Sequence, residues 1–208
     1  QKVLYFAREK KGHEGVKGTV TEDFQGILVH DHEITFYKYG NAHQECLAHV
    51  QRYLKDSMEN EPSLTWHRKM RELIREMVHY RNEHADDEHL DPKIVSDFEG
   101  KYQEILEKAK EEYILHEPSP YYRDGYNLYR RMQKYKTQHL LFLHDMRVPT
   151  TNNTAERCLR DYKRKQTFAM TFRSFESIEE LCQSKGVLLG VRKNNPNLYT
   201  AVKEIFNR

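Results

Sequence analysis

Two short apolar runs near the N-terminus are typical of β-strands. Residues 2–8 read KVLYFAR and residues 26–30 read GILVH, both rich in the apolar and aromatic residues that strands favour. Gly26 opens the second run and Asp31 follows it directly. Catalytic carboxylates often stand at the carboxyl ends of strands in open α/β sheets, although the local sequence favours an ordinary turn-forming aspartate.

From residue 41 onward, apolar residues recur at the three- and four-residue spacing of amphipathic helices. The pattern predicts four helices, over residues 41–56, 63–82, 92–115 and roughly 121–144. Ser63 opens the second of them, and Pro92 lies in the first turn of the third. We expect one buried face on the third helix, made of Ile94, Val95, Phe98, Tyr102, Ile105, Leu106 and Ala109.

Pro149 ends this helical block, and the Thr and Asn residues after it offer helix caps, so a new helix is predicted from Asn153. A helix advances about 100° per residue, which places Glu156 on one face with Arg157, Arg160, Lys163 and Arg164. The opposite face carries Ala155, Cys158, Leu159 and Tyr162, and Lys165 is the one cation on that side. We expect the apolar face to dock on the sheet and the charged face to point outward.

The end of the chain predicts a short extended segment and two helices. Residues 167–172, TFAMTF, suit a strand or an extended connection, and helices are predicted over residues 175–193 and 196–206. Asn195 and Pro196 form a suitable cap and first-turn pair for the last helix.

Charge is divided unevenly along the chain, although the net charge is only +2. Residues 1–120 hold 17 Lys and Arg against 24 Asp and Glu, whereas residues 121–193 hold 15 against 7. A basic region suits a polyanionic partner such as nucleic acid, or equally a solvated surface balanced by the acidic half. The helix predicted from Asn153 lies in the basic region.

Three scattered cysteines, Cys46, Cys158 and Cys182, argue against a disulfide framework and suit a reducing compartment. No apolar run approaches the roughly 18 residues needed to span a membrane, and no N-terminal block has the order of a signal peptide. We therefore expect a cytoplasmic protein with no membrane partner. The chain starts with Gln1 and enters its first apolar run at once, which indicates a piece of a longer protein.

Glu156 has two interpretations. With Asn153 as the cap it would occupy the third helical position and could close a capping box. Capping does not need the surrounding cations, whereas a metal-binding carboxylate working on a phosphate backbone would. Cys46 and His49 lie three residues apart and could form half of a zinc site, but no second pair of suitable spacing follows, which favours packing or hydrogen bonding.

The sequence lacks the motifs of several common enzyme classes. It has no glycine-rich phosphate loop, no Gly-x-Ser-x-Gly elbow and no convincing nucleophilic Cys and His arrangement. Kinase and hydrolase activities therefore have no support. His30 and His32, which flank Asp31, are the only histidines beside a candidate site.

Several segments together resemble the catalytic region of the IS66-type bacterial insertion-sequence transposases. In order, they are GILVHDHEITFYKYGNAHQECLAHVQRYL, a tryptophan-bearing helix, VPTTNNTAERCLRDYKRKQTFAMTFRS and GVLLGVRKNN. The most specific part is Asn152-Asn153-x-Ala155-Glu156-Arg157, followed by Arg160 and the pair Arg164-Lys165. Asp31 and the segment Cys46-x-x-His49-x-x-Arg52 support it, and the similarity covers nearly the whole chain.

The resemblance implies an α/β fold with a ribonuclease-H-like core, incomplete at its N-terminus, and a large all-helical insertion. Residues 1–40 and 145–208 would form the core and residues 41–144 the insertion. Asp31 matches the second and Glu156 the third member of the family's Asp, Asp, Glu triad. The first aspartate is expected on a strand before residue 2, a place that Asp23, between the two predicted strands, does not fill.

Such a triad holds two Mg²⁺ or Mn²⁺ ions about 4 Å apart for phosphoryl transfer. The resemblance thus implies a bacterial, nucleoid-associated DNA transposase that cleaves and transfers strands at insertion-element ends, as a homo-oligomer on double-stranded DNA. Asp31 and Glu156 would be its catalytic metal ligands here. The DNA-backbone contacts would be Arg157, Arg160, Lys163, Arg164 and Lys165. With one carboxylate missing, we expect weak or no catalysis from this chain alone.

Two alternatives stay open at the level of the sequence. One is a ribonuclease-H-like DNA-binding module without catalysis, and the other is a helical domain that binds a protein or RNA partner. An upstream aspartate on an apolar strand would favour the enzyme over the module. Asp31 and Glu156 side by side at the end of a mixed sheet would set the helical interaction domain aside.

Overall fold

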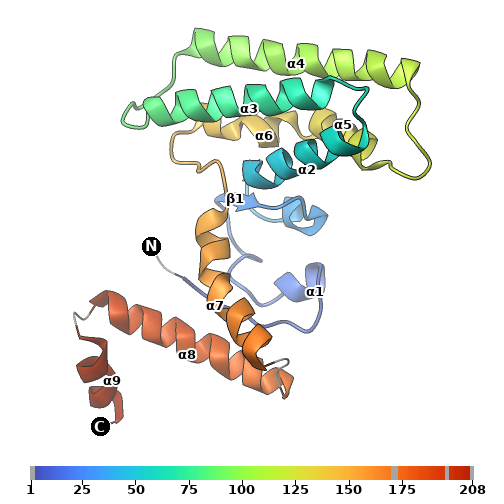
Figure 1. Ribbon diagram of the computed structural model, residues 1–208. Coiled ribbons are helices and arrows are strands. Elements are labelled where there is room, and N and C mark those ends of the chain that lie inside the picture. The colour runs from blue at the N-terminus through green and yellow to red at the C-terminus, as the bar shows by residue number, and fades with distance from the viewer. Residues whose placement is uncertain (1–2, 170–172, 195–196, 207–208) are drawn as a thin grey trace. The chain divides into compact units, whose positions relative to one another are not determined.

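The computed structural model describes residues 3–169, 173–194 and 197–206, which belong to two compact units. The middle unit comprises residues 24–152, and the terminal unit comprises residues 1–23 and 153–208. Both are mainly helical (Figure 1). The described sheet has two parallel strands and lies in the middle unit.

The two strands are β1 (Ile27–His30) and β2 (Ala42–Glu45), joined through a 3-10 helix, η1 (Ile34–Lys38). They pair in register, with Ile27 opposite Ala42 and His30 opposite Glu45. The predicted strand at residues 26–30 is confirmed, but the predicted helix over residues 41–56 is wrong at its start, where β2 lies. Pairing with β1 overrides the local helix preference of this segment.

Gln44 reinforces that pairing from inside the core. Its buried side-chain amide donates to the His139 carbonyl at 3.2 Å and accepts from the Phe142 N–H at 2.9 Å. Both partners lie on a helix that packs against β2. The polar side chain is thus satisfied in the interior and joins the sheet to the helical block.

Five helices complete the middle unit: α2 (Leu47–Asn60), α3 (Trp66–Glu83), α4 (Pro92–Leu115), α5 (Asp124–Lys134) and α6 (Lys136–His144). α2 packs on α3 and α3 lies alongside α4, while α6 packs on β2 (Figure 1). α4 has the predicted bounds because Asp91 caps it, accepting from the Lys93 N–H at 2.8 Å, and Pro92 suits its first turn.

The core confirms the predicted face of α4 with one exception. Val95, Phe98, Tyr102, Leu106 and Ala109 are buried, and Ile105 packs against them. Ile94 instead remains partly exposed at the edge of the stripe. The largest wholly buried side chains of this core come from several helices and include Trp66, Met70, Ile74, Met77 and Phe142.

Two helix boundaries in this block differ from prediction. α3 begins at Trp66 rather than Ser63, because the Glu112 carboxylate accepts from the N–H groups of Thr65 and Trp66 at 2.9 and 3.1 Å. The helix predicted over residues 121–144 is two helices, since Tyr135 between them leaves helical geometry. Its ring stacks on Tyr37, with 4.5 Å between centroids.

The terminal unit contains α1 (His13–Val16), α7 (Asn153–Ala169), α8 (Phe175–Asn194) and α9 (Leu198–Phe206). α7 begins at the predicted Asn153, and α8 and α9 confirm the two last predicted helices. Residues 3–8 form no strand, so the prediction of a strand over residues 2–8 is wrong for the described part of that segment.

Two other C-terminal predictions fall at the limits of the described residues. Residues 167–169 belong to α7 rather than to a strand, and residues 170–172 lie outside the described range, as do Asn195 and Pro196. Among the described helices, none is long and apolar enough to cross a membrane.

Candidate metal and DNA site

The ends of the two strands bring Asp31 and Cys46 together. Because β1 and β2 are parallel and end in register, the residue after each strand leaves the sheet at the same edge. The Cys46 N–H donates to the His30 carbonyl at 2.8 Å and extends the ladder by one bond. Cys46 is also the N-cap residue of α2. A carboxylate and a thiol therefore share one strand edge.

The end of the helical block returns to this edge. The Leu47 N–H, at the start of α2, donates to the Thr150 carbonyl at 2.9 Å. Two residues later, Asn152 donates from its side-chain amide to Asp31 Oδ1 at 2.7 Å and from its backbone N–H to Cys46 Sγ at 3.5 Å. One asparagine thus holds both groups.

His49 completes the cluster from the first turn of α2. Its Nδ1 lies 3.1 Å from Asp31 Oδ1, the same oxygen that Asn152 contacts. One ligand atom from each of Asp31, Cys46 and His49 lies within 4.8 Å of the other two. These three side chains form a group with the chemistry of a metal site.

Exposure differs sharply within this group. The Asp31 side chain is 47% exposed, whereas Cys46 is only 1% exposed and His49 is mostly buried. Both contacts to the Asp31 carboxylate converge on Oδ1, and no described residue makes a hydrogen bond or ion pair with Oδ2. The second oxygen of Asp31 can therefore take a ligand from solvent.

The contact from Asn152 confirms hydrogen bonding as a role for Cys46, and His49 lies beside the Asp31 carboxylate. Sequence reasoning missed Asn152 as a partner of Asp31, and it did not place Cys46 beside that carboxylate. The signal for Asn152 was present in the Asn152-Asn153 pair of the resemblance. Nothing in the sequence indicated that Asp31 is the partner of Asn152. That contact depends on the register of two strands and on the return of the chain after the helical block.

The histidines that flank Asp31 serve other partners. His30 is buried, and its Nε2 lies 3.2 Å from His43 Nδ1. Burial lowers the pKa of both imidazoles, and the nearby His30 lowers the pKa of His43 further. His32 Nδ1 lies 2.9 Å from Glu45 Oε1. Among the described contacts, neither ring touches the Asp31 carboxylate.

Glu45 is a buried carboxylate that several neighbouring side chains contact. His139 Nε2 lies 3.2 Å from its Oε2, Tyr37 donates to its Oε1, and Arg131 Nε stands 3.6 Å away. Burial alone would raise the pKa of Glu45, but the contacts with His139, His32 and Tyr37 outweigh it and hold that pKa well below its usual range. Glu45 thus joins β2 to α5 and α6 as an ionised group.

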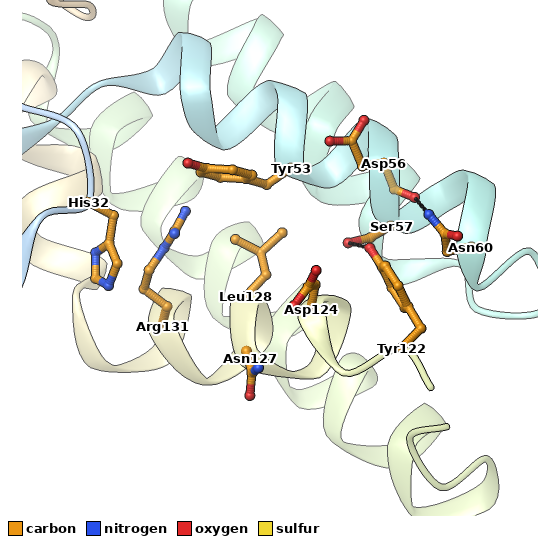
Figure 2. A pocket seen from close by; sticks show the side chains of 10 residues that line it. All are labelled: His32, Tyr53, Asp56, Ser57, Asn60, Tyr122, Asp124, Asn127, Leu128 and Arg131. Carbon is orange, nitrogen blue, oxygen red and sulfur yellow. Dashed lines mark hydrogen bonds between the residues drawn. The ribbon is translucent and has the colours of Figure 1, made fainter. Parts of the chain in front are cut away.

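A cavity of about 650 Å³ opens beside this network (Figure 2). His32 and Arg131 line one end, where the Arg131 guanidinium carbon lies 4.8 Å from the centre of the Tyr53 ring. Asp56 and Asp124 line the other part, beside Tyr122. Because the lining carries both signs of charge, the cavity lacks the cationic character that a polyanion requires.

The second half of the predicted site lies on α7, in the terminal unit. Glu156 is in the first turn and half-buried. The predicted DNA-binding cations are all exposed, and none forms an ion pair with a described side chain: Arg157, Arg160, Lys163, Arg164 and Lys165. Asp31 belongs to the middle unit, so each half is described by itself.

Within the terminal unit, the other side of α7 contacts the N-terminal segment and α8. The ring centroids of Tyr5 and Tyr162 lie 4.9 Å apart, and Tyr5 donates to the Cys158 carbonyl at 3.2 Å. Tyr162 donates to the Leu181 carbonyl at 3.3 Å. Lys165 lines a groove with Tyr162, as expected from its place on the helix wheel, whereas Leu159 is exposed. The predicted docking of this face on the sheet stays a prediction.

Comparison with known protein families gives a match over most of the chain. The family model described as Transposase IS66 family matches residues 1–179, a range that contains every candidate site residue from Asp31 to Lys165. No curated protein and no solved structure matches the chain.

Proposed function

The chain belongs to the IS66 transposase family, and we propose that it is the region that cleaves and transfers DNA strands, with Asp31 and Glu156 as metal ligands. In this proposal a ribonuclease-H-like core, residues 1–40 and 145–208, surrounds a helical insertion over residues 41–144. The parallel pair of strands with a carboxylate directly after the first supports it, because functional groups gather at that end of α/β sheets.

The hydrogen bond from Asn152 to Asp31 carries the proposal. Asn152 stands four residues before Glu156, a length of chain that reaches at most about 14 Å when extended. Asn153 to Glu156 are helical, and a helix rises only about 1.5 Å per residue. The chain therefore limits how far Glu156 can lie from Asn152, and this limit is compatible with the metal ion that the proposal shares between Glu156 and Asp31.

The donor atoms fit a hard divalent ion. Mg²⁺ and Mn²⁺ prefer carboxylate oxygens, and Asp31 offers Oδ2 on its half-exposed side. When bound, a pair of such ions supplies activation of the attacking water or 3′-hydroxyl and stabilises the leaving oxygen. Asn152 and His49 would hold the Asp31 carboxylate in one orientation through its Oδ1. The first aspartate of the triad is not assigned to a residue of this chain.

The exposed cations of α7 would bind the DNA backbone next to Glu156. Charge-assisted contacts from Arg157, Arg160, Lys163 and Arg164 would offset the repulsion between phosphates and the catalytic carboxylates. Lys165, beside the α8 groove, would reach a more distant phosphate. In this proposal the protein acts in the bacterial cytoplasm, at the nucleoid, as a homo-oligomer on element ends and target DNA.

Binding of Mn²⁺ to this chain, followed by electron paramagnetic resonance of the free ion, tests the shared ligands. We expect Asp31→Asn and Glu156→Gln each to lower Mn²⁺ affinity about tenfold or more, as loss of a ligand does. Glu176→Gln, in the first turn of α8, is the matched control and should change nothing. If Asp31→Asn lowers the affinity and Glu156→Gln does not, the two carboxylates do not share an ion.

A further inference from the structure

We propose that Cys46, His49 and Asp31 also form a binding site for Zn²⁺ or a similar ion of borderline softness. The site itself needs neither DNA nor Glu156. Its effect on catalysis, argued below, rests on the proposed function, because it uses the same Asp31 carboxylate.

The donor set selects the metal. A thiolate and an imidazole are typical ligands of Zn²⁺ and poor ligands of Mg²⁺, whereas a carboxylate serves both. Zn²⁺ bonds of about 2.0 to 2.3 Å place tetrahedral ligands about 3.3 to 3.8 Å apart. The three ligand atoms lie within 4.8 Å of one another, and His49 Nδ1 is already 3.1 Å from Asp31 Oδ1. Small side-chain rotations therefore bring all three to bonding distance.

Asn152 orients two of these three ligands. Its backbone N–H points at Cys46 Sγ, and its side-chain amide donates to the Asp31 carboxylate. Hydrogen bonds to the ligands are a regular feature of metal sites, because they fix ligand orientation and lower the cost of gathering negative charge. The residue that ties the end of the helical block to the sheet thus also supports the metal group.

The cluster of Asp31, Cys46 and His49 is held rigidly on one side and is open to solvent on the other. Cys46 and His49 are set by the first turn of α2, whose start is bonded to Thr150, and the thiol is buried. Asp31 is half-exposed, so an ion can enter from solvent and keep a water in the fourth position. Binding would release the thiol proton to solvent.

Occupation by Zn²⁺ would compete with Mg²⁺ for the Asp31 carboxylate. A Zn²⁺ ion held by Asp31, Cys46 and His49 would draw charge from that carboxylate and place a second cation beside the Mg²⁺ position, which weakens Mg²⁺ binding. We therefore expect Zn²⁺ to inhibit Mg²⁺-dependent DNA cleavage by the complete protein. Cys46→Ser should relieve that inhibition, since it removes the soft ligand and leaves Asp31 in place.

The test uses the reduced, metal-free chain titrated with Co²⁺, whose bond to a thiolate gives an intense near-ultraviolet absorption band. We expect this band in the parent chain, its displacement by Zn²⁺, and its loss in Cys46→Ser. Cys158→Ser is the matched control and should keep the band. His49→Gln and Asp31→Asn should each lower Co²⁺ affinity at least about tenfold.

Two further variants keep the result interpretable. Glu156→Gln should retain the Co²⁺–thiolate band, and this result would separate the Cys46 site from the proposed Mg²⁺ site. The band should also appear in a protein that is inactive on DNA. If Cys46→Ser fails to fold by circular dichroism, Asn152→Ala leaves all three ligands in place and should lower Co²⁺ affinity. A parent chain without a thiolate band, or a band that persists in folded Cys46→Ser, would overturn the site.

Discussion

The side-chain amide of Asn152 donates a 2.7 Å hydrogen bond to the carboxylate of Asp31, although 121 positions separate the two residues. The bond from Leu47 to Thr150 lies beside it and closes the base of the helical block. The block therefore leaves and rejoins the chain at the same strand edge. The two ends of the helical block, residues 47 and 150, thus meet through a backbone hydrogen bond.

Asn152→Ala should reduce Mg²⁺-dependent DNA cleavage by the complete protein about tenfold or more, because Asp31 loses the donor that orients it. Cleavage rates measured on an element-end duplex check this. Thr154→Ala, an exposed residue of α7, serves as the control and should stay near the parent rate. A parent-like Asn152→Ala enzyme would show that the hydrogen bond has no catalytic role.

Glu156→Gln should abolish nicking and joining by the complete protein, since the amide cannot replace a charged metal ligand of nearly the same shape. Substrate and product strands separated on a denaturing gel give the measurement. Glu176→Gln should remain active. Nicking that survives in Glu156→Gln would remove this residue from the catalytic site.

Arg160→Ala should weaken DNA binding by a similar factor across unrelated sequences and reduce the slope of log affinity against log salt by about one. The physical reason is the loss of one phosphate contact, which positions the backbone and carries no base information. Fluorescence anisotropy at several salt concentrations measures it. Lys110→Ala removes the same charge from an exposed position of α4 and should leave the slope unchanged. A loss confined to one sequence would indicate base contact instead.

Stability should fall as pH is lowered below about 6.5. Burial lowers the folded-state pKa values of His30, His43 and His139 from the ordinary value of 6.5, so the unfolded chain binds more protons below that pH. Each extra proton bound by the unfolded state costs about 1.4 kcal/mol per pH unit. The depressed pKa of Glu45 adds a second loss, which begins below about 4.5.

Urea unfolding at a series of pH values checks this dependence. His43→Gln should flatten the fall between pH 6.5 and 5.5, because one group of lowered pKa is gone. His79→Gln, on the exposed surface of α3, should preserve the fall. A stability that is constant or rises on acidification through this range would contradict the assignment of neutral buried histidines.

Leu106→Ala should destabilise the middle unit by about 2 to 5 kcal/mol, since it empties a site at the centre of the α4 face. Ile94→Ala, at the exposed edge of the same helix, should cost clearly less. Chemical denaturation of both variants measures the difference. Equal costs at the two positions would mean that the buried stripe is misplaced.

Local signals predicted some elements well because neighbouring residues decide them. α4 has both its cap, Asp91, and its apolar stripe in one segment, and α7 begins where Pro149 and the Asn residues indicate. Residues 42–45 form a strand although the local pattern predicts a helix, because their extended conformation depends on pairing with β1. Tyr135 was not recognised as a break because the ring it stacks on, Tyr37, comes from far along the chain.

The sequence by itself determined the buried and exposed faces of the long helices, the uneven charge and the carboxylates Asp31 and Glu156 as candidates. Only the tertiary structure decided that Asp31 stands beside Cys46, His49 and Asn152. Helix faces follow from residues three and four apart, which the chain order contains. The cluster follows from the register of two parallel strands and from the return of the chain at Thr150, and both are set by backbone hydrogen bonds between distant segments.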